Sequence, residues 1–241
     1  MKPHIFYDYD GTLGDTLLEH IQFLHDMNQK YDTQLNLPST KDYKACKKLI
    51  SMPGKPKTTG VPMEILVRNA GFPENLIQRV LMMYKKTFDS NPNYQGKLFQ
   101  GVPELIQNMF NAGFHQSILP SNVRKNFMPP LERADIKHLF ANSLDLNELK
   151  KYHSLSKVDC LRDYSDRFCL SSQECIYVGD TDGDFLAAQK VEVVFVGVSY
   201  GWQTQQGKKY PFPVAHNCSQ LQRILLSLGE LKDDDNDNYK S

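Results

Sequence analysis

The sequence lacks the cysteine spacing of a zinc site, any long apolar run and an excess of charge of one sign. Its five cysteines include no C-x-x-C pair, which excludes the usual arrangement of zinc ligands. No run of about 18 apolar residues occurs, which argues against a membrane-spanning helix. Basic and acidic residues both number 28, so the net charge provides no attraction for nucleic acid or an anionic membrane.

An apolar leader is also missing from the first residues, where Met-Lys-Pro-His runs directly into Ile5-Phe6-Tyr7. An odd number of cysteines without such a leader favours a reduced chain, and we therefore expect a cytoplasmic protein. The composition is that of a globular protein, with 23% charged and 40% hydrophobic residues. A chain of 241 residues suffices for one large domain that carries an insert.

The apolar pattern predicts an α/β core that is interrupted by a helical insert. Residues 4–10 have the pattern of a short strand, and apolar residues then recur at helical spacing from 16 to about 90. After the break at 91–93, strand and helix patterns alternate, which predicts a parallel sheet covered on both faces. The expected strands are 114–119, 139–143, 175–178 and 193–198, and the expected helices are 103–111, 131–137, 158–168 and a helix that includes 185–190.

These patterns set the expected domain boundaries. We place the α/β core at residues 1–15 and 95–228 and an all-helical cap domain at 16–94. Residues 229–241 are rich in aspartate, and we expect them to form an acidic disordered tail. Within the insert, residues 51–60 are dense in Gly, Pro and Lys and are typical of a loop. Lys55 or Lys57 of this loop is a candidate for binding a substrate carboxylate or a second phosphate, unless both lysines are simply solvated.

Two aspartates end the first strand, in the segment Asp8-Tyr9-Asp10-Gly11-Thr12-Leu13. Residues two apart in a strand point to the same side, and ligands of open α/β sheets bind at the carboxyl ends of the strands. Adjacent carboxylates repel unless they share a cation or a proton, and Mg²⁺ accepts such oxygens together with those of a phosphate. Gly11 permits a tight turn that brings backbone amides near a phosphate. The alternative is an ordinary turn or helix cap.

A second acidic segment, Gly179-Asp180-Thr181-Asp182-Gly183-Asp184, follows the strand expected at 175–178. Three carboxylates within five residues are typical of a site for a hard cation. A calcium loop of the EF-hand type is excluded, because it needs Gly at the sixth position and Glu at the twelfth, where this chain has Phe185 and Val191.

Together the two segments resemble the first and last motifs of the haloacid dehalogenase superfamily, in its phosphoglycolate phosphatase-like branch with an inserted helical cap. The resemblance implies a Rossmann-like core in which Asp8 is the nucleophile and Asp10 is the general acid and base. It also implies a Mg²⁺ site formed by Asp8, Asp10, Asp180 and Asp184. A carboxylate at position 10 is typical of the phosphatase branches, and Asp182 occupies a variable position that we expect to face solvent.

The resemblance extends to residues that would bind the phosphoryl group. Ser121 follows the strand at 114–119 and matches a Ser or Thr that donates a hydrogen bond to phosphoryl oxygens, with the Asn122 backbone amide beside it. Pro120 departs from the family pattern, which has an unconstrained apolar residue there. Gly11 and Thr12 belong to the first motif, and we expect them to bind substrate as well.

The family also carries a lysine before its last motif, which neutralises the carboxylates and the phosphoryl group. Lys150, Lys151 and Lys157 are all candidates. Lys157 follows Ser156 and opens a predicted helix 23 residues before Asp180, which resembles one common form of the motif, so we favour it. Lys55 from the insert completes the set of expected substrate-binding residues.

The function implied by the resemblance is Mg²⁺-dependent hydrolysis of a small phosphorylated metabolite through an aspartyl-phosphate. Phosphoglycolate, a sugar phosphate and a nucleotide all fit this description. We expect no nucleic-acid or membrane partner, and a monomer or homodimer. Two alternatives remain: a phosphomutase of the β-phosphoglucomutase type, and a non-catalytic binding protein on the same fold.

Overall fold

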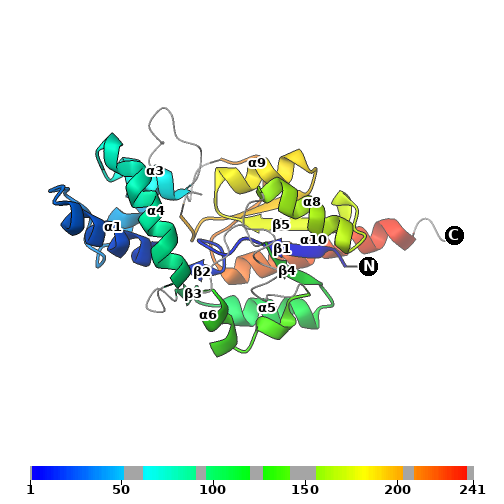
Figure 1. Ribbon diagram of the computed structural model, residues 1–241. Helices are drawn as coiled ribbons and strands as arrows, with labels where there is room; N and C mark the ends of the chain where they lie inside the picture. The colour runs from blue at the N-terminus through cyan, green and yellow to red at the C-terminus, as the bar shows by residue number, and fades with distance from the viewer. Residues whose placement is uncertain are drawn as a thin grey trace.

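A computed structural model describes residues 2–51, 62–90, 96–119, 127–141, 156–202 and 209–237 of the chain. At its centre lies a parallel sheet of five strands in the order β4-β1-β5-β6-β7 (Figure 1). The strands are β1 (His4–Tyr7), β4 (Gln116–Ile118), β5 (Cys175–Gly179), β6 (Val194–Val198) and β7 (Val214–Ala215). β1 pairs with β4 on one side and with β5 on the other, so strands far apart in sequence flank the first strand. The predicted parallel sheet is confirmed.

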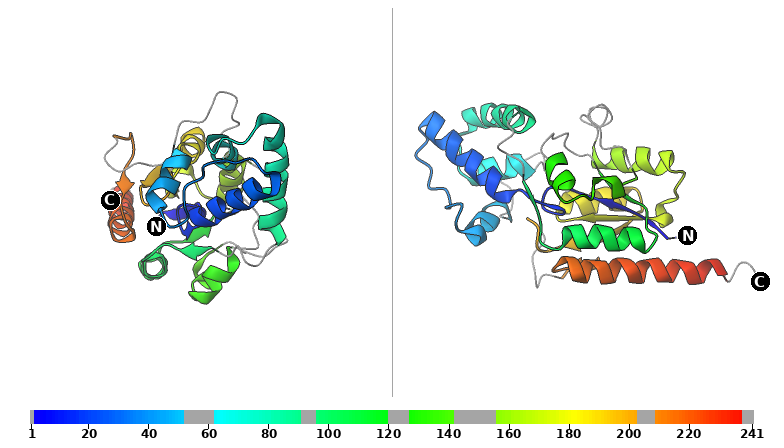
Figure 2. Two further views of the ribbon diagram at one scale, coloured as in Figure 1. Left: turned by 90° about the vertical axis from the view of Figure 1, so that its left-hand side faces the viewer. Right: turned by 90° about the horizontal axis from the view of Figure 1, so that it is seen from below.

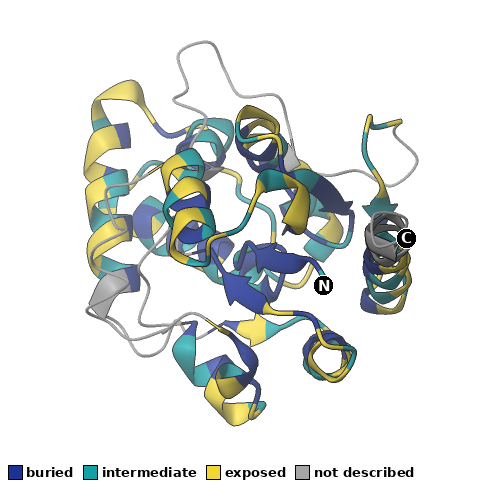
Figure 3. Ribbon diagram, turned by 90° about the vertical axis from the view of Figure 1, so that its right-hand side faces the viewer, coloured by how far each residue is buried: buried dark blue, intermediate teal, exposed yellow. Residues whose placement is uncertain are grey.

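Both faces of the sheet are buried, because alternate strand residues enter two different apolar clusters. Ile5 and Tyr7 point to one face and Phe6 to the other. The first face is covered by α5 (Val102–Asn111), α6 (Met128–Arg133) and α10 (Cys218–Asp237), and the second by α8 (Lys157–Arg167) and α9 (Asp182–Lys190). Figure 2 shows α10 running beside α5, and Figure 3 shows the strands buried between these layers.

In the described residues between β2 (Gly14–Asp15) and β3 (Lys97–Leu98), four helices form a separate apolar cluster at one end of the sheet, opposite the two termini (Figure 1). They are α1 (Leu17–Tyr31), α2 (Tyr43–Ser51), α3 (Pro62–Asn69) and α4 (Glu74–Ser90). Trp202, which follows β6, packs into the same cluster. The described part of the insert is helical, as the sequence predicts, and we interpret it as a cap domain.

The two segments that connect the core to the helical insert lie side by side. β2 (Gly14–Asp15) and β3 (Lys97–Leu98) form a two-stranded antiparallel sheet, with Gly14 opposite Leu98. The sequence did not reveal this pair, because each strand has only two residues and therefore shows no periodicity.

Two expected elements of the core differ in the structure. The helix expected at 131–137 runs from Met128 to Arg133, and Asp135 with a φ of 53° ends it in the left-handed region. A 3₁₀ turn follows at Lys137–Leu139, so the strand expected at 139–143 does not form over 139–141, and residues 142 and 143 lie outside the described part. In place of a strand, a hydrogen bond from the Ala141 amide to the Gln116 carbonyl (2.6 Å) connects this segment to β4.

The C-terminal segment is more ordered than its composition suggests. We predicted a disordered tail from residue 229, but α10 continues to Asp237, and residues 238–241 lie outside the described part. Gly229 lies within this helix, where its missing side chain permits close packing, since a Cβ there would lie 2.5 Å from the Phe114 ring. Leu221 and Leu225 anchor the helix in the core, and adding turns to an existing helix is inexpensive.

The described helices include none with the length and apolarity needed to cross a bilayer. All five cysteines are free thiols, and four of them are buried.

Candidate active site

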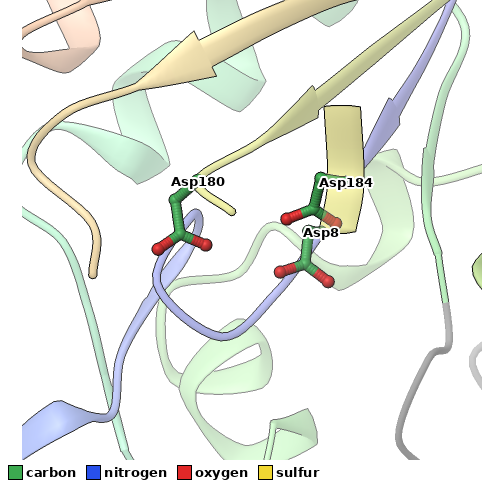
Figure 4. A group of neighbouring side chains, drawn as sticks. All are labelled: Asp8, Asp180 and Asp184. Atoms are coloured by element: carbon green, nitrogen blue, oxygen red, sulfur yellow. The ribbon is translucent and has the colours of Figure 1, made fainter. Parts of the chain in front are cut away.

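Three carboxylates from three different elements meet at the carboxyl end of the sheet (Figure 4). Asp8 directly follows β1, and its amide donates to the Val178 carbonyl of β5 (2.9 Å). Asp180 directly follows β5, and Asp184 lies in the first turn of α9. Oxygen atoms of the three side chains all lie within 4.8 Å of one another. The prediction that the acidic ends of the two distant segments meet is confirmed.

Two glycines allow the surrounding loops to close on Asp180. Gly11 has a φ of +81°, in the left-handed region, and a Cβ there would lie 2.5 Å from Asp180 Oδ2. A Cβ at Gly201 would lie 2.1 Å from the Gly11 carbonyl oxygen. The Trp202 amide beside it donates to Asp180 Oδ2 at 2.5 Å. The first acidic loop and the loop after β6 thus fix Asp180 between them.

Among the described residues, Lys157 brings a positive charge to this cluster. It opens α8, where Ser156 and Asp159 form a capping box that fixes the start of the helix. Its Nζ donates to Asp8 Oδ1 (3.0 Å) and to Asp184 Oδ1, with 24% of the side chain exposed. The structure therefore places Lys157 against the carboxylates, whereas the rival candidates at 150 and 151 lie outside the described residues.

Asp184 is held by more hydrogen bonds than any sequence pattern suggested. Its Oδ2 accepts from the Thr181 amide (3.0 Å) and from the Thr181 hydroxyl (2.5 Å), and its Oδ1 accepts from the Tyr177 hydroxyl (2.5 Å). Thr181 was missed, although Thr-x-x-Asp at a helix start is the signature of a capping box. Tyr177 had no such signal, since it is one of several apolar residues in β5.

Burial and crowding shift the pKa values of the cluster in opposite directions. Burial raises the pKa of Asp8 to about 7, because the attraction to Lys157 only partly offsets it and Asp184 and Asp10 add repulsion. Burial, together with Asp184 and Asp8, raises the pKa of Asp180 well above its ordinary value. Burial also opposes ionisation of Asp184, but Lys157 and the hydrogen bonds outweigh it and lower the pKa of that carboxyl. In Lys157, attraction to Asp184 and Asp8 outweighs burial and raises the pKa.

The donor set fits a divalent hard cation. When all groups are ionised, these three carboxylates and the Lys157 ammonium group sum to two negative charges in a buried position. Such charges are costly to bury without a counterion. Carboxylate oxygens are the ligands that Mg²⁺ prefers, so Asp8, Asp180 and Asp184 are the residues that could hold it.

Asp10 is not in this group of three, so its place in the expected set of four metal ligands stays a prediction. Period-two alternation ends with β1 at Tyr7, because the loop turns back on itself and the Tyr9 carbonyl accepts from the Leu13 (3.0 Å) and Gly14 (2.7 Å) amides. The Asp10 carboxylate instead accepts a hydrogen bond from the Thr16 hydroxyl at 2.8 Å.

The other predicted phosphate-binding residues are only partly described. Thr12 is fully buried, and its hydroxyl has no hydrogen-bond partner among the described residues. Ser121, Asn122 and Lys55 lie outside the described part of the chain, as does Lys57. Asp182 is exposed, as expected.

The cap contributes a lysine that the sequence did not single out. Lys47 on α2 donates to the Ser199 carbonyl at 2.6 Å, in the loop that also holds Asp180. Burial lowers the pKa of Lys47, and attraction to the Asp180 carboxylate opposes that shift. Residues 41–48 contain several lysines, and nothing in their spacing distinguishes the one that faces the core.

Comparison with known proteins gives a consistent result. The model of a family described as haloacid dehalogenase-like hydrolase matches residues 5–198. A 5'-nucleotidase from Pseudomonas aeruginosa is 23% identical over 227 residues, covering 91% of this chain and 92% of that protein. A phosphoglycolate phosphatase from Synechococcus elongatus is 28% identical over 208 residues, covering 84% of this chain and 86% of that protein.

The fold has close counterparts among solved structures. A haloacid dehalogenase-like hydrolase family protein from Streptococcus pneumoniae superposes with a TM-score of 0.68 at 17% identity. The superposition covers 92% of this chain and 98% of that one. Both the core and the helical insert therefore have counterparts in that fold.

Proposed function

The chain belongs to the haloacid dehalogenase-like hydrolase family and is a phosphatase, and we propose that it hydrolyses a small phosphomonoester with Asp8 as nucleophile and Mg²⁺ as cofactor. The observation that carries the proposal is the buried Asp8 carboxylate at the end of β1, with Lys157 3.0 Å away and Asp180 and Asp184 beside it. Uncatalysed hydrolysis of phosphate monoesters is extremely slow, so such a site must both attack phosphorus and neutralise charge.

In the first step a carboxylate oxygen of Asp8 attacks phosphorus, the bond to the ester oxygen breaks, and Asp10 protonates the departing alkoxide. In the second step Asp10 removes a proton from water. The resulting hydroxide attacks phosphorus, which releases inorganic phosphate and the Asp8 carboxylate. Lys157, together with the Ser121 hydroxyl and the Asn122 amide, stabilises the negative charge of the phosphoryl oxygens.

Mg²⁺ held by Asp8, Asp180 and Asp184 would supply further neutralisation of that charge. The chain's own contribution is to fix the ligands: Thr181 and Tyr177 orient Asp184, and the loop after β6 orients Asp180. Thr12 and Gly11 complete the loop beside the phosphoryl group in this proposal.

The relatives and the helical insert together support a proposal for the substrate class. The two named relatives are a 5'-nucleotidase and a phosphoglycolate phosphatase, both of which act on small phosphomonoesters. In this chain the half-buried Lys47 brings a second positive charge from the cap towards Asp180. We propose that Lys47, with Lys55, binds the part of a small phosphorylated metabolite that lies away from the phosphoryl group.

The test of this proposal is Asp8→Asn, assayed with p-nitrophenyl phosphate and then with phosphoglycolate and nucleoside monophosphates. We expect at least a ~10³-fold loss of kcat, because the amide cannot form the phosphorylated intermediate. EDTA should abolish wild-type turnover, and added Mg²⁺ should restore it.

Asp182→Asn is the matched control, since it makes the same change at an exposed carboxylate two residues from Asp180 and should leave turnover unchanged. Full activity of Asp8→Asn would rule out the nucleophile, and turnover in EDTA would rule out the metal.

A further inference from the structure

The loop that follows β6 contacts the cap at two places and the core between them. At its start the Ser199 carbonyl accepts from Lys47 of α2 at 2.6 Å. At residue 202 the tryptophan side chain is buried within the apolar cluster of the cap helices. In between, the Tyr200 ring packs edge-on against Phe99 of the core, with their centroids 5.0 Å apart. Residues 199–202 are therefore attached to the core and to the cap at once.

The same four residues fix the Asp180 carboxylate. The Trp202 amide donates to Asp180 Oδ2, and a Cβ at Gly201 would lie 2.5 Å from the Asp180 Cβ, so the loop lies directly against this side chain. Because the Trp202 ring and amide belong to one residue, a loop movement that withdraws the ring from the cap also moves the donor away from Asp180. The orientation of a metal-binding carboxylate commonly depends on such a supporting hydrogen bond.

The indole of Trp202 is held in the cap by packing. Its Nε1 has no hydrogen-bond partner among the described residues. The ring packs edge-on against His20 of α1, with their centroids 4.9 Å apart, and Phe88 of α4 lies 5.0 Å from the same histidine. Burial of a ring of this size removes a large apolar area from water, so the indole stabilises the cap in its place against the core.

We propose that this loop links Mg²⁺ binding to the docking of the cap: Asp180 keeps the orientation that binds the ion only while Lys47 and the Trp202 ring hold the loop against the cap. The inference rests on the proposed Mg²⁺ site. Lys47 and Trp202 are positioning residues, since neither side chain supplies one of the three carboxylates. Such a coupling is reciprocal, so the docked cap strengthens Mg²⁺ binding and the bound ion strengthens docking by the same factor.

Electrostatics alone predicts the opposite effect of removing Lys47. The Lys47 ammonium group and the Asp180 carboxylate attract each other. Removal of that positive charge would by itself strengthen the binding of a cation at Asp180. The proposed link predicts weaker binding, because the contact that fixes Ser199 is lost. The sign of the change in affinity therefore decides between the two effects.

The experiment measures Mg²⁺ affinity by isothermal titration calorimetry of the full chain without substrate. Lys47→Met should raise the Kd for Mg²⁺ by at least roughly fivefold, the lower end of typical coupling between sites. Lys44→Met is the matched control, because it removes the same charge from an exposed position on the same helix and should leave the Kd unchanged. Lys47 lies outside the buried apolar cluster, so its variant should fold as the wild type does.

A second variant tests the other contact with the cap. Trp202→Leu keeps the backbone amide that bonds to Asp180 but removes the ring, so it should also raise the Kd for Mg²⁺ at least roughly fivefold. Trp202→Phe keeps an aromatic ring and should restore most of the affinity. Reciprocity is measured on the wild type by acrylamide quenching of Trp202, the one tryptophan of the chain, which added Mg²⁺ should reduce.

Unchanged or tighter Mg²⁺ binding in either Lys47→Met or Trp202→Leu would overturn the inference. Quenching that Mg²⁺ leaves unchanged in the wild type would overturn it as well. Wild-type turnover that requires Mg²⁺ would leave the proposed function standing in both cases. A wild-type chain that binds no Mg²⁺ would instead remove the proposed cofactor, and the inference with it.

Discussion

Two segments with the same sequence signature behave in opposite ways. Thr181-x-x-Asp184 at the start of α9 forms a closed capping box, in which the threonine and the acid exchange hydrogen bonds. Thr16-x-x-Glu19 at the start of α1 leaves the box open, and both side chains bond elsewhere, to Asp10 and to the Gly96 amide. One segment is wholly within the core, and the other is where the chain passes into the helical insert.

The difference shows how one local pattern can serve two purposes. The closed box holds Asp184 rigidly beside Lys157, so that its charge keeps a fixed place in the carboxylate cluster. In the open box the side chains of Thr16 and Glu19 instead connect α1 to Asp10 and to the segment that returns from the insert to the core. Both side chains are bonded to parts of the chain outside the helix. We therefore expect variants of the closed box to affect stability and activity together, and variants of the open box to affect mainly activity.

The largest effect should come from the cation that the closed box supports. Lys157→Met removes the ammonium group that pairs with the buried Asp8 and Asp184 carboxylates, which costs about 3 kcal/mol at pH 7. The cost should shrink at pH 5, because the carboxylates can then take up protons. Turnover should fall at least a hundredfold, since one stabilising charge near the phosphoryl group is lost. Chemical denaturation at both pH values and steady-state kinetics measure these effects.

The control for this variant is Lys190→Met, which removes an exposed lysine from the end of α9. It should change neither stability nor turnover. Wild-type stability and turnover in Lys157→Met would show that the carboxylates do not depend on this ammonium group. The closed box would then have no fixed ion pair to support.

The sequence predicted the carboxylate cluster and its lysine well, for physical reasons. Asp8 and Asp180 directly follow apolar strands, and parallel strands bring their carboxyl ends to one edge of a sheet. Asp184 is fixed one helical turn after Asp180, and Lys157 opens the helix before that strand. These positions depend on topology and short-range geometry, which the order of apolar and polar residues encodes.

The surroundings of Asp10 and Thr16 could not be predicted in the same way. The expectation that Asp10 points with Asp8 assumed a continuing strand, but the strand ends at Tyr7 and the loop folds back on Tyr9. The Thr16 carbonyl bonds to the His20 ring, which in turn bonds to Tyr84 on a distant helix. Which partner such a side chain meets depends on tertiary packing, and no local pattern records it.

A second prediction sets the pH at which the two boxes should be compared. Burial, and repulsion from His115, lower the pKa of His4 from 6.5 to about 4, in a site where Nε2 lies 2.9 Å from the Ser117 hydroxyl. Between these values the unfolded chain binds a proton that the folded chain does not. Stability is therefore complete above pH 6.5 and falls as the pH drops towards 4, by about 2 to 3 kcal/mol.

His4→Gln should flatten this decline, measured by urea denaturation between pH 4 and 7.5. His138→Gln is the control, since His138 is exposed and should keep the wild-type slope. An equal slope in His4→Gln would show that another group causes the acid sensitivity, and that group would then have to be identified before stabilities are compared below neutral pH.

The smallest effect tests the comparison directly, at pH 7.5 and by thermal unfolding. Thr181→Val removes a hydroxyl that accepts from the helix and donates to Asp184, so it should cost about 1 to 2 kcal/mol and lower Tm by a few degrees. Thr16→Val removes no capping bond, so it should cost about half as much or less while still lowering kcat. Equal losses of stability in the two variants would mean that Thr16 serves α1 as an ordinary cap, and the distinction between a closed and an open box would fail.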